Sequence, residues 1–295
     1  HNPTHPLFWQ RSFHFETVEQ VLSVVIPAIV PVLKLSGLYQ RGLQNALAIQ
    51  QTAFSVVDAA LPDAFDGFKM LFLSDLHIDG NDALLPPLCE ALEAEAVDLC
   101  LLGGDYRFLV HGAFRKVIDR FQDFLPSIKS THGIIGILGN HDSWEMIRPL
   151  ERLGIIMLLN EALEVKRGQE SIWVLGVDDP HYYKCDDYQK ANQGIPAQAF
   201  RLLLSHATGT LFHLRETDAV NLCLCGHTHA GQISLPLLGP VITHSKLKGP
   251  YIYGRWQYKH INGYTSSGVG TSAIPIRYNT SSEIVRITLR KTEKP

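Results

Sequence analysis

The sequence contains few cysteines and few charged residues, and each shortage argues against one class of protein. Five cysteines are scattered over 295 residues without a pairing pattern, which argues against a disulfide-rich secreted domain and favours a reducing compartment. Charged residues make up 19% of the chain and the formal net charge is -3. The chain therefore lacks the basic surplus that a nucleic-acid-binding protein normally shows.

The chain also lacks an apolar run long enough to span a bilayer. The apolar stretch at residues 21–33 (VLSVVIPAIVPVL) is well short of the ~20 residues that a spanning helix needs. Two interpretations stay open: a helix buried against the main domain and divided by its two prolines, or a segment that lies in the membrane interface. Aromatic anchors and a cation nearby support the second: Phe8, Trp9, Arg11, Phe13 and Phe15. The sequence begins with His1 rather than Met, so we expect further residues upstream.

Short apolar runs alternate with helix-like stretches from Phe68 onward, which is the pattern of an α/β layered domain. We expect buried strands at residues 70–73, 99–102, 134–138, 173–177, 202–204 and 222–225. Amphipathic helices are expected at residues 84–96 and 114–124, where apolar residues recur three or four positions apart. Residues 283–289 alternate polar and apolar side chains, which predicts a half-exposed antiparallel strand. A boundary near Asp66-Gly67 would separate an N-terminal appendage (1–66), with helix-like periodicity, from the main domain (67–295).

Metal-binding side chains follow five of the strand-like runs. The five segments are Ser74-Asp75-Leu76-His77, Gly104-Asp105, Gly139-Asn140-His141-Asp142, Ser205-His206 and Gly226-His227-Thr228-His229. The first and last segments each place two ligands two residues apart, so an extended backbone would point both side chains the same way. Parallel strands would bring such pairs together beyond their carboxyl ends. The glycines before Asp105 let the backbone turn sharply, so that its carboxylate can bridge two cations.

Asn140 and His206 complete a set of seven oxygen and nitrogen donors, which is too many for one tetrahedral ion and suits two ions with open positions. The donor mixture favours Mn first, and then Fe, Zn or Co, over Ca, Cu or Mg. Two cations ~3.5–4 Å apart activate water and clamp the oxygens of an in-line displacement, so the predicted reaction is hydrolysis of a phosphate ester. His141 is the candidate proton donor to the leaving oxygen, and Asp142 is expected to orient it. Alone, the Asn-His-Asp turn would also fit a capped helix start.

The order of these motifs, D-x-H, G-D, G-N-H-[DE], a single His and G-H-x-H, resembles that of the calcineurin-like metallophosphoesterases from about Phe68 to Leu289. The resemblance implies a four-layer α-β-β-α sandwich with a dinuclear site at one edge of its two sheets. It implies one ligand group for each metal: Asp75, His77 and His229 for the first, and Asn140, His206 and His227 for the second. By the same resemblance, Asp105 bridges the two metals and His141 acts on the leaving group.

Four further segments resemble the bacterial membrane-associated branch of that family: Leu61-Pro62, residues 226–236 (GHTHAGQISLP), residues 267–272 (SGVGTS) and Pro275-Ile276-Arg277. That branch includes broad phosphodiesterases and a class of UDP-2,3-diacylglucosamine pyrophosphatase, which releases UMP and lipid X during lipid A synthesis. The resemblance implies a lipid-linked nucleotide as substrate, hydrolysed at the cytoplasmic face of the bacterial inner membrane or in the cytoplasm. The chain departs from the branch at Ala230, where glycine is common, and at Arg107, where an apolar residue is usual.

Several residues and functions have competing interpretations. Arg107 stands two residues beyond the expected bridging carboxylate, where its guanidinium can bind a substrate phosphate or simply face solvent. Asp178, Asp179 and His181 follow another strand-like run, but Asp-Pro is an ordinary turn there, and we leave them outside the site, as we do His244. Rival functions are a general phosphodiesterase with a soluble or phospholipid substrate, a phosphomonoesterase or protein phosphatase, and a binding scaffold without catalysis. No nucleic acid and no partner protein is implied.

Overall fold

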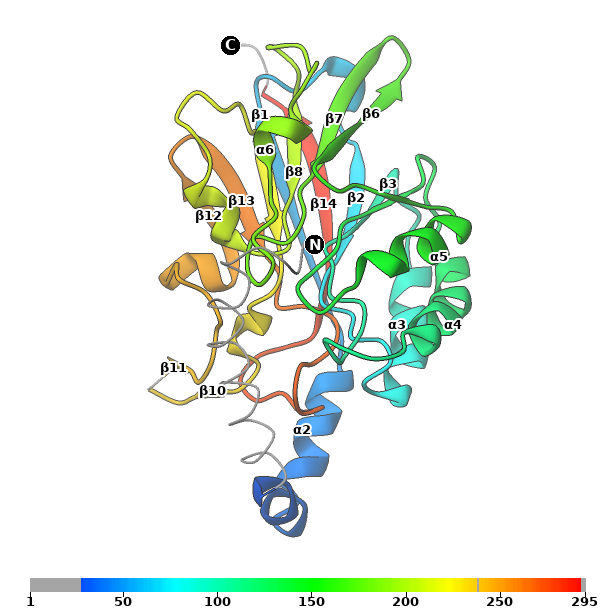
Figure 1. Ribbon diagram of the computed structural model, residues 1–295, viewed down its shortest axis with the longest axis vertical. Helices are drawn as coiled ribbons and strands as arrows, with labels where there is room; N and C mark the ends of the chain where they lie inside the picture. The colour runs from blue at the N-terminus through cyan, green and yellow to red at the C-terminus, as the bar shows by residue number, and fades with distance from the viewer. Residues whose placement is uncertain (1–27, 238, 293–295) are drawn as a thin grey trace, which may run out of the picture.

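Two six-stranded sheets form the centre of the molecule, in a computed structural model that describes residues 28–237 and 239–292 (Figure 1). The first sheet contains, in spatial order, β1 (Gln50–Asp58), β14 (Glu283–Lys291), β2 (Lys69–Leu73), β3 (Leu99–Leu102), β4 (Ile134–Gly136) and β5 (Ile155–Met157). The second contains β12 (Gly254–Tyr258), β13 (Ile261–Thr265), β9 (Leu222–Cys225), β8 (Arg201–Leu204), β7 (Glu170–Gly176) and β6 (Glu161–Arg167). Most of residues 21–33 and the aromatic residues before them lie outside the described part.

The sheets pack face to face, and helices cover their outer faces. One buried cluster joins the two inner faces and includes Phe72, Leu101, Val174 and Leu224. The outer face of the first sheet is covered by α3 (Leu85–Glu93), α4 (Arg115–Phe124) and α5 (Ile147–Arg152) (Figure 1). The outer face of the second is covered more thinly, by α6 (Tyr188–Ala191), a 3-10 helix (Thr208–Phe212) and loops. The expected α-β-β-α arrangement is confirmed, with one thin helical layer.

The expected buried strands and helices form close to their expected bounds. The strands at Leu99–Leu102 and Leu222–Cys225 match to the residue, and every side chain in both is buried. A strand buried on both faces needs a continuous apolar run, which is why these runs could be recognised in the sequence. In α4 the buried residues are Val117, Phe121 and Phe124, so one stripe of the helix faces the sheet.

The strand expected at residues 283–289 forms as β14, and one of its two faces is only partly buried, as expected. β14 lies between β1, with which it pairs parallel, and β2, with which it pairs antiparallel. Val285, Ile287 and Leu289 pack between the two sheets, while Ile284 packs toward the helices. The inner face of β14 is therefore buried, while on its outer face Arg286 and Thr288 are half-buried and Arg290 is exposed.

β1 precedes the boundary expected near Asp66-Gly67, yet it belongs to the sandwich. It pairs with β14 along its whole length, from Gln50 opposite Glu283 to Asp58 opposite Lys291. The helix before it, α2 (Leu38–Leu47), packs on the segment that precedes β14: the Arg277 amide donates to the Gly42 carbonyl at 3.0 Å. The expected boundary therefore has to move to the amino-terminal side of β1, since residues 50–58 are part of the first sheet.

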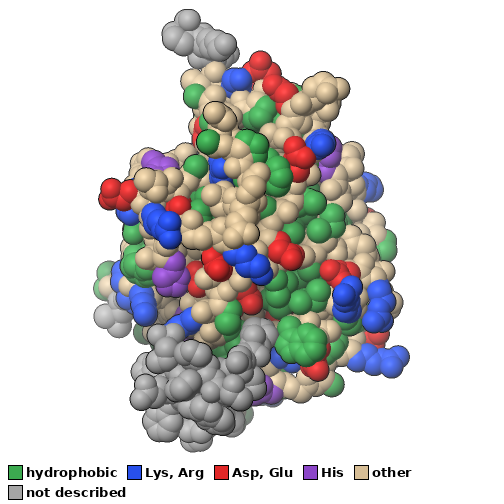
Figure 2. All heavy atoms as spheres, turned by 45° about the horizontal axis from the view of Figure 1, so that its top comes forward, with side chains coloured by type: hydrophobic (Ala, Val, Ile, Leu, Met, Phe, Trp, Pro, Cys, Tyr) green, Lys and Arg blue, Asp and Glu red, His purple; other side chains and the backbone are tan. Residues whose placement is uncertain are grey.

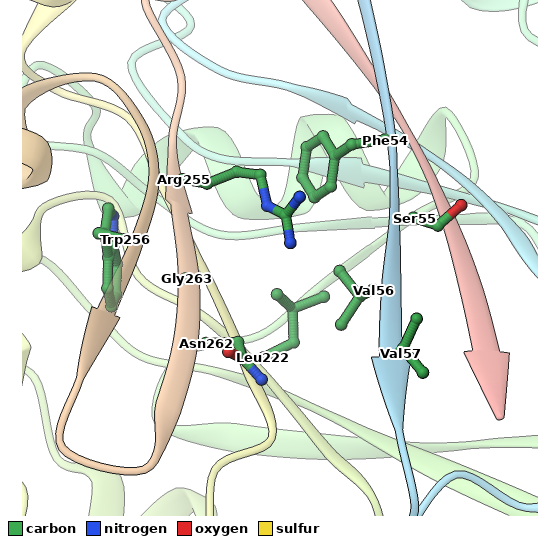
Figure 3. A pocket seen from close by; sticks show the side chains of 9 residues that line it. All are labelled: Phe54, Ser55, Val56, Val57, Leu222, Arg255, Trp256, Asn262 and Gly263. Atoms are coloured by element: carbon green, nitrogen blue, oxygen red, sulfur yellow. The ribbon is translucent and has the colours of Figure 1, made fainter. Parts of the chain in front are cut away.

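The molecular surface carries no large field of one charge on the face shown in Figure 2, where basic and acidic side chains are interspersed. Within the described ranges, every helix is too short or too polar to traverse a bilayer. A cavity of about 150 Å³ lies where β1 faces β12 and β13, and Arg255 extends over the Phe54 ring at its wall, with the guanidinium carbon 5.4 Å from the ring centre (Figure 3). The described lining of this cavity contains no acid, histidine or thiol.

Candidate metal centre

The candidate ligands lie just beyond the carboxyl ends of parallel strands. β2, β3 and β4 run parallel in the first sheet, and β7, β8 and β9 run parallel in the second. Five of these strands are followed by the seven candidate ligands: Asp75 and His77 after β2, Asp105 after β3, Asn140 after β4, His206 after β8, and His227 and His229 after β9. The two sheets thus bring residues more than a hundred positions apart to one edge of the sandwich.

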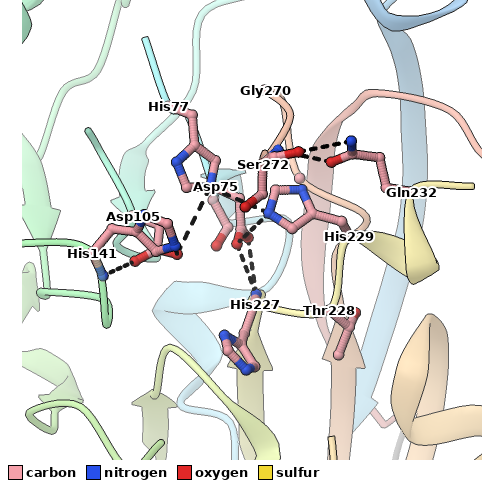
Figure 4. Close-up of polar contacts among 12 residues, drawn as sticks. Asp75, His77, Asp105, His141, His227, Thr228, His229, Gln232, Gly270 and Ser272 are labelled. Atoms are coloured by element: carbon pink, nitrogen blue, oxygen red, sulfur yellow. Dashed lines mark hydrogen bonds and ion pairs between the residues drawn. The ribbon is translucent and has the colours of Figure 1, made fainter. Parts of the chain in front are cut away.

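A first cluster consists of Asp75, His77 and His229, whose ligand atoms all lie within 4.8 Å of one another (Figure 4). Nε2 of His77 is 3.2 Å from Nε2 of His229, and the latter is 3.5 Å from Oδ1 of Asp75. Burial lowers the pKa of His77 to about 3 and holds the pKa of His229 well below its usual value. Both imidazoles are therefore neutral at pH 7, which is the form that binds a metal.

A second cluster consists of Asp105, His206 and His227, and Asn140 lies against it. Oδ1 of Asn140 is 3.1 Å from Nε2 of His206. Oδ2 of Asp105 is 3.2 Å from Nε2 of His206 and 3.7 Å from Nε2 of His77, so this one oxygen lies between the two clusters. A carboxylate in that position is suited to be shared by two cations.

The charges of the second cluster are set by the pair Asp105 and His206. Burial opposes ionisation of Asp105, but the neighbouring His206 and His141 hold the pKa of its carboxyl well below the usual range. Against the effect of burial on its own ring, the Asp105 carboxylate raises the pKa of His206 to about 10. Burial also raises the pKa of Asp75 to about 6. The two buried carboxylates lie among imidazoles, and a divalent cation would neutralise their negative charge. The metal would replace the protons that these ligands otherwise carry.

The donor set fits two divalent transition metals. Imidazole nitrogens supply the majority of ligand atoms in the two clusters, and carboxylate oxygens supply the rest. Such mixed nitrogen and oxygen sites suit Mn, Fe, Co or Zn, whereas Ca and Mg prefer oxygen alone. The geometry therefore fits a dinuclear centre with open positions for water and substrate.

His141 lies at the edge of the two clusters. Its Nε2 is 4.0 Å from Oδ2 of Asp105, and its side chain is 12% exposed. Its Nδ1 lies 2.7 Å from the carbonyl oxygen of Phe108. Since a carbonyl oxygen can only accept, Nδ1 carries the proton of the neutral ring and Nε2 faces the centre. That nitrogen can therefore exchange a proton with a substrate held at the clusters.

Asp142 contacts the backbone and does not provide the orienting contact expected for His141, which the Phe108 carbonyl makes instead. Its carboxylate accepts hydrogen bonds from the amides of Gly139 at 2.9 Å, Asp105 at 2.8 Å and Tyr106 at 2.9 Å. Burial raises the pKa of Asp142 to about 7. Asp142 therefore joins the loop after β3 to the loop after β4, and it positions the shared carboxylate through its backbone.

Arg107 is buried, and its guanidinium donates to backbone carbonyls. The acceptors are the carbonyl oxygens of His141, Val110 and Gly112, the last at 3.1 Å. These bonds hold together the loop that follows Asp105. The contact between Arg107 and a substrate phosphate stays a prediction, and a phosphate would have to compete with these carbonyls.

The ligand residues adopt left-handed backbone conformations that the sequence did not reveal. The angle φ is +53° at Asp75, +38° at His77, +56° at Asp105, +73° at His227 and +51° at His229. The extended backbone expected for the two i, i+2 pairs is therefore wrong. Asp75 and His77 still belong to one cluster, whereas His227 and His229 divide between the two clusters. Left-handed conformations are unfavourable for these residue types and persist where surrounding contacts impose them. Here the contacts are backbone hydrogen bonds between loops, such as the Asp75 amide to the Gly104 carbonyl at 2.9 Å.

Two glycines next to the ligands lie where any side chain would clash with a neighbouring loop. A Cβ atom at Gly104, where φ is +88°, would lie 2.4 Å from the amide nitrogen of Gly139. A Cβ atom at Gly226 would lie 1.9 Å from Oγ of Ser74 and 2.2 Å from a carboxylate oxygen of Asp75. The predicted sharp turn before Asp105 is confirmed, and the loops meet more closely than any side chain would permit.

Three residues that sequence reasoning left outside the site lie beside it. The ring of His181 is 4.1 Å from that of His227, and the ring of His244 is 6.2 Å from it, as measured between ring centres. Asp179 is buried and accepts hydrogen bonds from the amides of His181, Tyr182 and Tyr183 at 2.6 to 2.9 Å. Asp179 and His181 follow the parallel strand β7. The criterion that selected the other ligands, a polar side chain directly after a buried strand, would therefore have selected these two residues as well.

Arg277 is a further buried residue behind the first cluster. It is fully buried and donates to the carbonyl oxygens of His229 at 3.2 Å, Ser267 at 2.6 Å, Gly268 at 3.1 Å and Gly270 at 2.7 Å. Burial lowers the pKa of Arg277 to about 10, so the side chain stays charged at pH 7. Its sequence neighbourhood gave no sign of this role beyond a resemblance to related chains.

Comparison with known proteins agrees with the geometry. The model of the calcineurin-like phosphoesterase family matches residues 68–231. An uncharacterized metallophosphoesterase of Helicobacter pylori is 30% identical over 276 residues, which are 87% of this chain and 68% of that protein. The phosphodiesterase YaeI of Escherichia coli is 30% identical over 239 residues, 75% of this chain and 82% of that protein.

The uncharacterized metallophosphoesterase YkuE of Bacillus subtilis is 28% identical over 267 residues, 86% of this chain and 90% of that protein. The family match begins immediately before β2 and extends past the ligands after β9, so it covers every strand end that carries a candidate ligand. The chain therefore belongs to the calcineurin-like phosphoesterase family, and it is a metal-dependent phosphoester hydrolase.

Proposed function

We propose that this hydrolase cleaves phosphodiester or pyrophosphate bonds, and that its substrate is a lipid-linked nucleotide such as UDP-2,3-diacylglucosamine, giving UMP and lipid X. The observation that carries the proposal is the pair of ligand clusters on either side of Asp105, with His141 at their edge. The diester choice is supported by the similarity to YaeI, which is named a phosphodiesterase. That name equally supports the rival function, a general phosphodiesterase with a soluble or phospholipid substrate.

The ligands divide between two cations in this proposal. The first cation would be held by Asp75, His77 and His229, the second by Asn140, His206 and His227, and Asp105 would be shared by both. When bound, the cations supply Lewis-acid activation of water and of the phosphoryl oxygens. Mn is the favoured metal, with Fe, Zn and Co as alternatives, because the donors are mixed imidazole and carboxylate.

His141 then acts as the general acid toward the leaving oxygen. Its Nδ1 is held by the Phe108 carbonyl, so the ring is fixed with Nε2 toward the clusters. Because Nδ1 keeps its own proton, the ring would act as an acid in its imidazolium form: it would give the Nε2 proton to the leaving oxygen as the ester bond breaks and be left neutral. Asp142 contributes indirectly, because its carboxylate fixes the loops after β3 and β4, which carry the candidate ligands Asp105 and Asn140.

Contact with a membrane surface is part of the proposal, at the cytoplasmic face of the bacterial inner membrane. Apolar side chains point into solvent on the helical segment at residues 28–38, where Val32 is 64% and Leu35 is 91% exposed. A second exposed apolar group surrounds the hairpin of β10 (Ser234–Leu235) and β11 (Gly239–Pro240), where Leu235 and Val241 are both exposed. Both groups lie in the lower half of Figure 1. Such surfaces bind membrane interfaces by burying apolar area among lipid head groups.

The test is a comparison of three substrates with the Mn-loaded protein. UMP release from UDP-2,3-diacylglucosamine, absent in the Asp105→Asn variant, is the expected result. Cleavage of bis-p-nitrophenyl phosphate without UMP release would favour the general phosphodiesterase. Faster cleavage of p-nitrophenyl phosphate than of the diester would favour a phosphomonoesterase, and no cleavage of any substrate would overturn the proposed reaction.

A further inference from the structure

A large cavity adjoins the second ligand cluster. Its volume is about 1160 Å³, and its wall is formed by parts of residues 180–184, 207–213 and 240–252. His227, a candidate ligand, lies in this wall together with His181 and His244. The cavity is therefore continuous with the metal centre, and a substituent of a phosphate ester held at the clusters can extend into it.

The described lining of this cavity is cationic. It contains three lysines, Lys184, Lys246 and Lys248, and neither aspartate nor glutamate. Within residues 28–237 and 239–292, neither Lys246 nor Lys248 takes part in a salt bridge, and Nζ of Lys248 donates a hydrogen bond to Oγ1 of Thr243 at 3.4 Å. These two ammonium groups are therefore not neutralised by the protein's own carboxylates, and they raise the local concentration of anions.

The lysines are held by the packing of the residue between them. Leu247 is half-buried and packs on the apolar cluster that covers the outer face of the second sheet, whereas Lys246 and Lys248 are both exposed. The backbone at Lys248 is extended, with φ of -112° and ψ of 178°. Because side chains alternate along an extended segment, the anchor at Leu247 directs its two neighbours away from the core.

Another part of the cavity wall is apolar. Phe212 is 51% exposed and Val241 is 56% exposed, and both belong to the lining. The cavity thus combines exposed apolar side chains with two ammonium groups, those of Lys246 and Lys248, that no described carboxylate neutralises. This combination suits a ligand with a carbon-rich portion and a negative charge, and it suits a purely hydrocarbon ligand or a cation poorly.

We infer that this cavity is a specificity subsite for a second anionic group, a phosphate or a carboxylate, carried on one arm of the phosphodiester substrate. The inference rests on the proposed hydrolysis of phosphodiesters and adds the substrate class. Lys246 and Lys248 bind the second anion, and Phe212 and Val241 contact the carbon-rich part that connects it to the scissile phosphate. Diesters whose arms are both uncharged leave the lysines without a partner and are the poorer substrates.

The test uses two substrates that differ in one phosphate: the p-nitrophenyl ester of thymidine 5′-phosphate and the same ester with an added 3′-phosphate. With the Mn-loaded protein, we expect kcat/KM to be about tenfold higher for the bisphosphate compound, the combined effect of two exposed ion pairs. In the Lys246→Gln/Lys248→Gln variant this ratio falls to about one. The matched control is Lys166→Gln/Lys259→Gln, which removes the same charge from lysines outside the lining and keeps the ratio at about ten.

Three results would overturn the inference: equal kcat/KM for both compounds in the wild type, an unchanged ratio in the Lys246→Gln/Lys248→Gln variant, or an equal fall in the control. Failure of the proposed function is distinguishable, because then neither compound is cleaved. Calorimetric binding of thymidine 3′,5′-bisphosphate and thymidine 5′-phosphate supplies the readout in that case. About tenfold tighter binding of the bisphosphate, lost in the Lys246→Gln/Lys248→Gln variant, supports the subsite, and equal affinities contradict it.

Discussion

Replacement of Arg277 by methionine should weaken metal binding at the first cluster as well as destabilise the fold. The guanidinium joins the His229 carbonyl to three carbonyls of the segment 267–270. That segment also donates to the loop after β2, through the Gly270 amide to the Asp75 carbonyl at 2.8 Å and the Val269 amide to the Ser74 carbonyl at 2.9 Å. Arg277 therefore fixes the relative positions of two residues of the first cluster, Asp75 and His229.

The expected loss of stability in Arg277→Met follows from the backbone carbonyls that lose the guanidinium as a hydrogen-bond donor. Each buried acceptor that loses its partner costs about 1–3 kcal/mol. The carbonyls of His229 and Gly268 keep the amides of Gln232 and Glu283 as donors, whereas those of Ser267 and Gly270 lose their donor, so we expect a loss of about 2–6 kcal/mol in the free energy of unfolding. Nε of Arg277 has no hydrogen-bond partner, so its removal recovers part of this cost. The methionine fills much of the volume, and the conservative Arg277→Lys variant should lose less.

Arg201 offers a matched control at the opposite end of the second sheet. It is 3% exposed and donates to the carbonyl oxygens of Ala199 at 2.7 Å, Pro196 at 2.8 Å and Ala197 at 3.2 Å. It begins β8, whereas the ligands follow the ends of the strands. Arg201→Met should therefore destabilise the protein to a similar extent without changing its affinity for metal.

The assay combines urea unfolding in the presence of EDTA with calorimetric titration of Mn into the EDTA-treated, dialysed proteins. We expect both methionine variants to unfold at lower urea concentration than the wild type. Only Arg277→Met should show one of its two Mn affinities reduced, by about tenfold or more. If Arg277→Met binds two Mn ions as tightly as the wild type, or if Arg201→Met loses metal affinity equally, the positioning role assigned to Arg277 is refuted.

Three further outcomes are expected. His141→Ala should keep two bound Mn ions and lower kcat about 10²- to 10⁴-fold, as loss of a general acid does; unchanged turnover would remove His141 from the mechanism. Gly104→Ala should destabilise the protein by at least about 1 kcal/mol in urea unfolding, since φ is +88° there and the added Cβ would lie 2.4 Å from a backbone nitrogen. Mn at about 100 times its Kd should stabilise the folded protein by about 2.7 kcal/mol per site, and an unfolding midpoint that does not depend on Mn would contradict a site present in the folded state alone.

The sequence predicted an α/β layered domain because buried parallel strands require continuous apolar runs, whereas the four-layer arrangement was implied by the family resemblance. The runs at residues 99–102 and 222–225 are of this kind and match β3 and β9. The central position of β14 could not be predicted in the same way, since the pairing of β14 with β1 joins residues more than 200 positions apart. No local pattern encodes such a contact.

The candidate ligands were found because carboxylates and imidazoles at the ends of several strands are an uncommon combination. Six of the seven ligands form the two clusters, and each cluster combines residues from both sheets. Their backbone geometry could not be found, because a left-handed conformation at His77 or His229 is disfavoured by residue type and is imposed by contacts between loops. Arg277 was missed as a positioning residue for a similar reason. Its acceptors are carbonyl oxygens, which every residue carries and which therefore leave no trace in the sequence.

The place of β14 has a consequence for biosynthesis. The strand lies between β1 and β2, although it is the last strand of the described chain to be made. Until residues up to Lys291 have left the ribosome, β1 and β2 have no common neighbour, and the apolar faces of a split sheet are exposed to solvent and to chaperones. The segment that carries Arg277 emerges shortly before β14, so the first cluster becomes ordered only after this late segment has been synthesised.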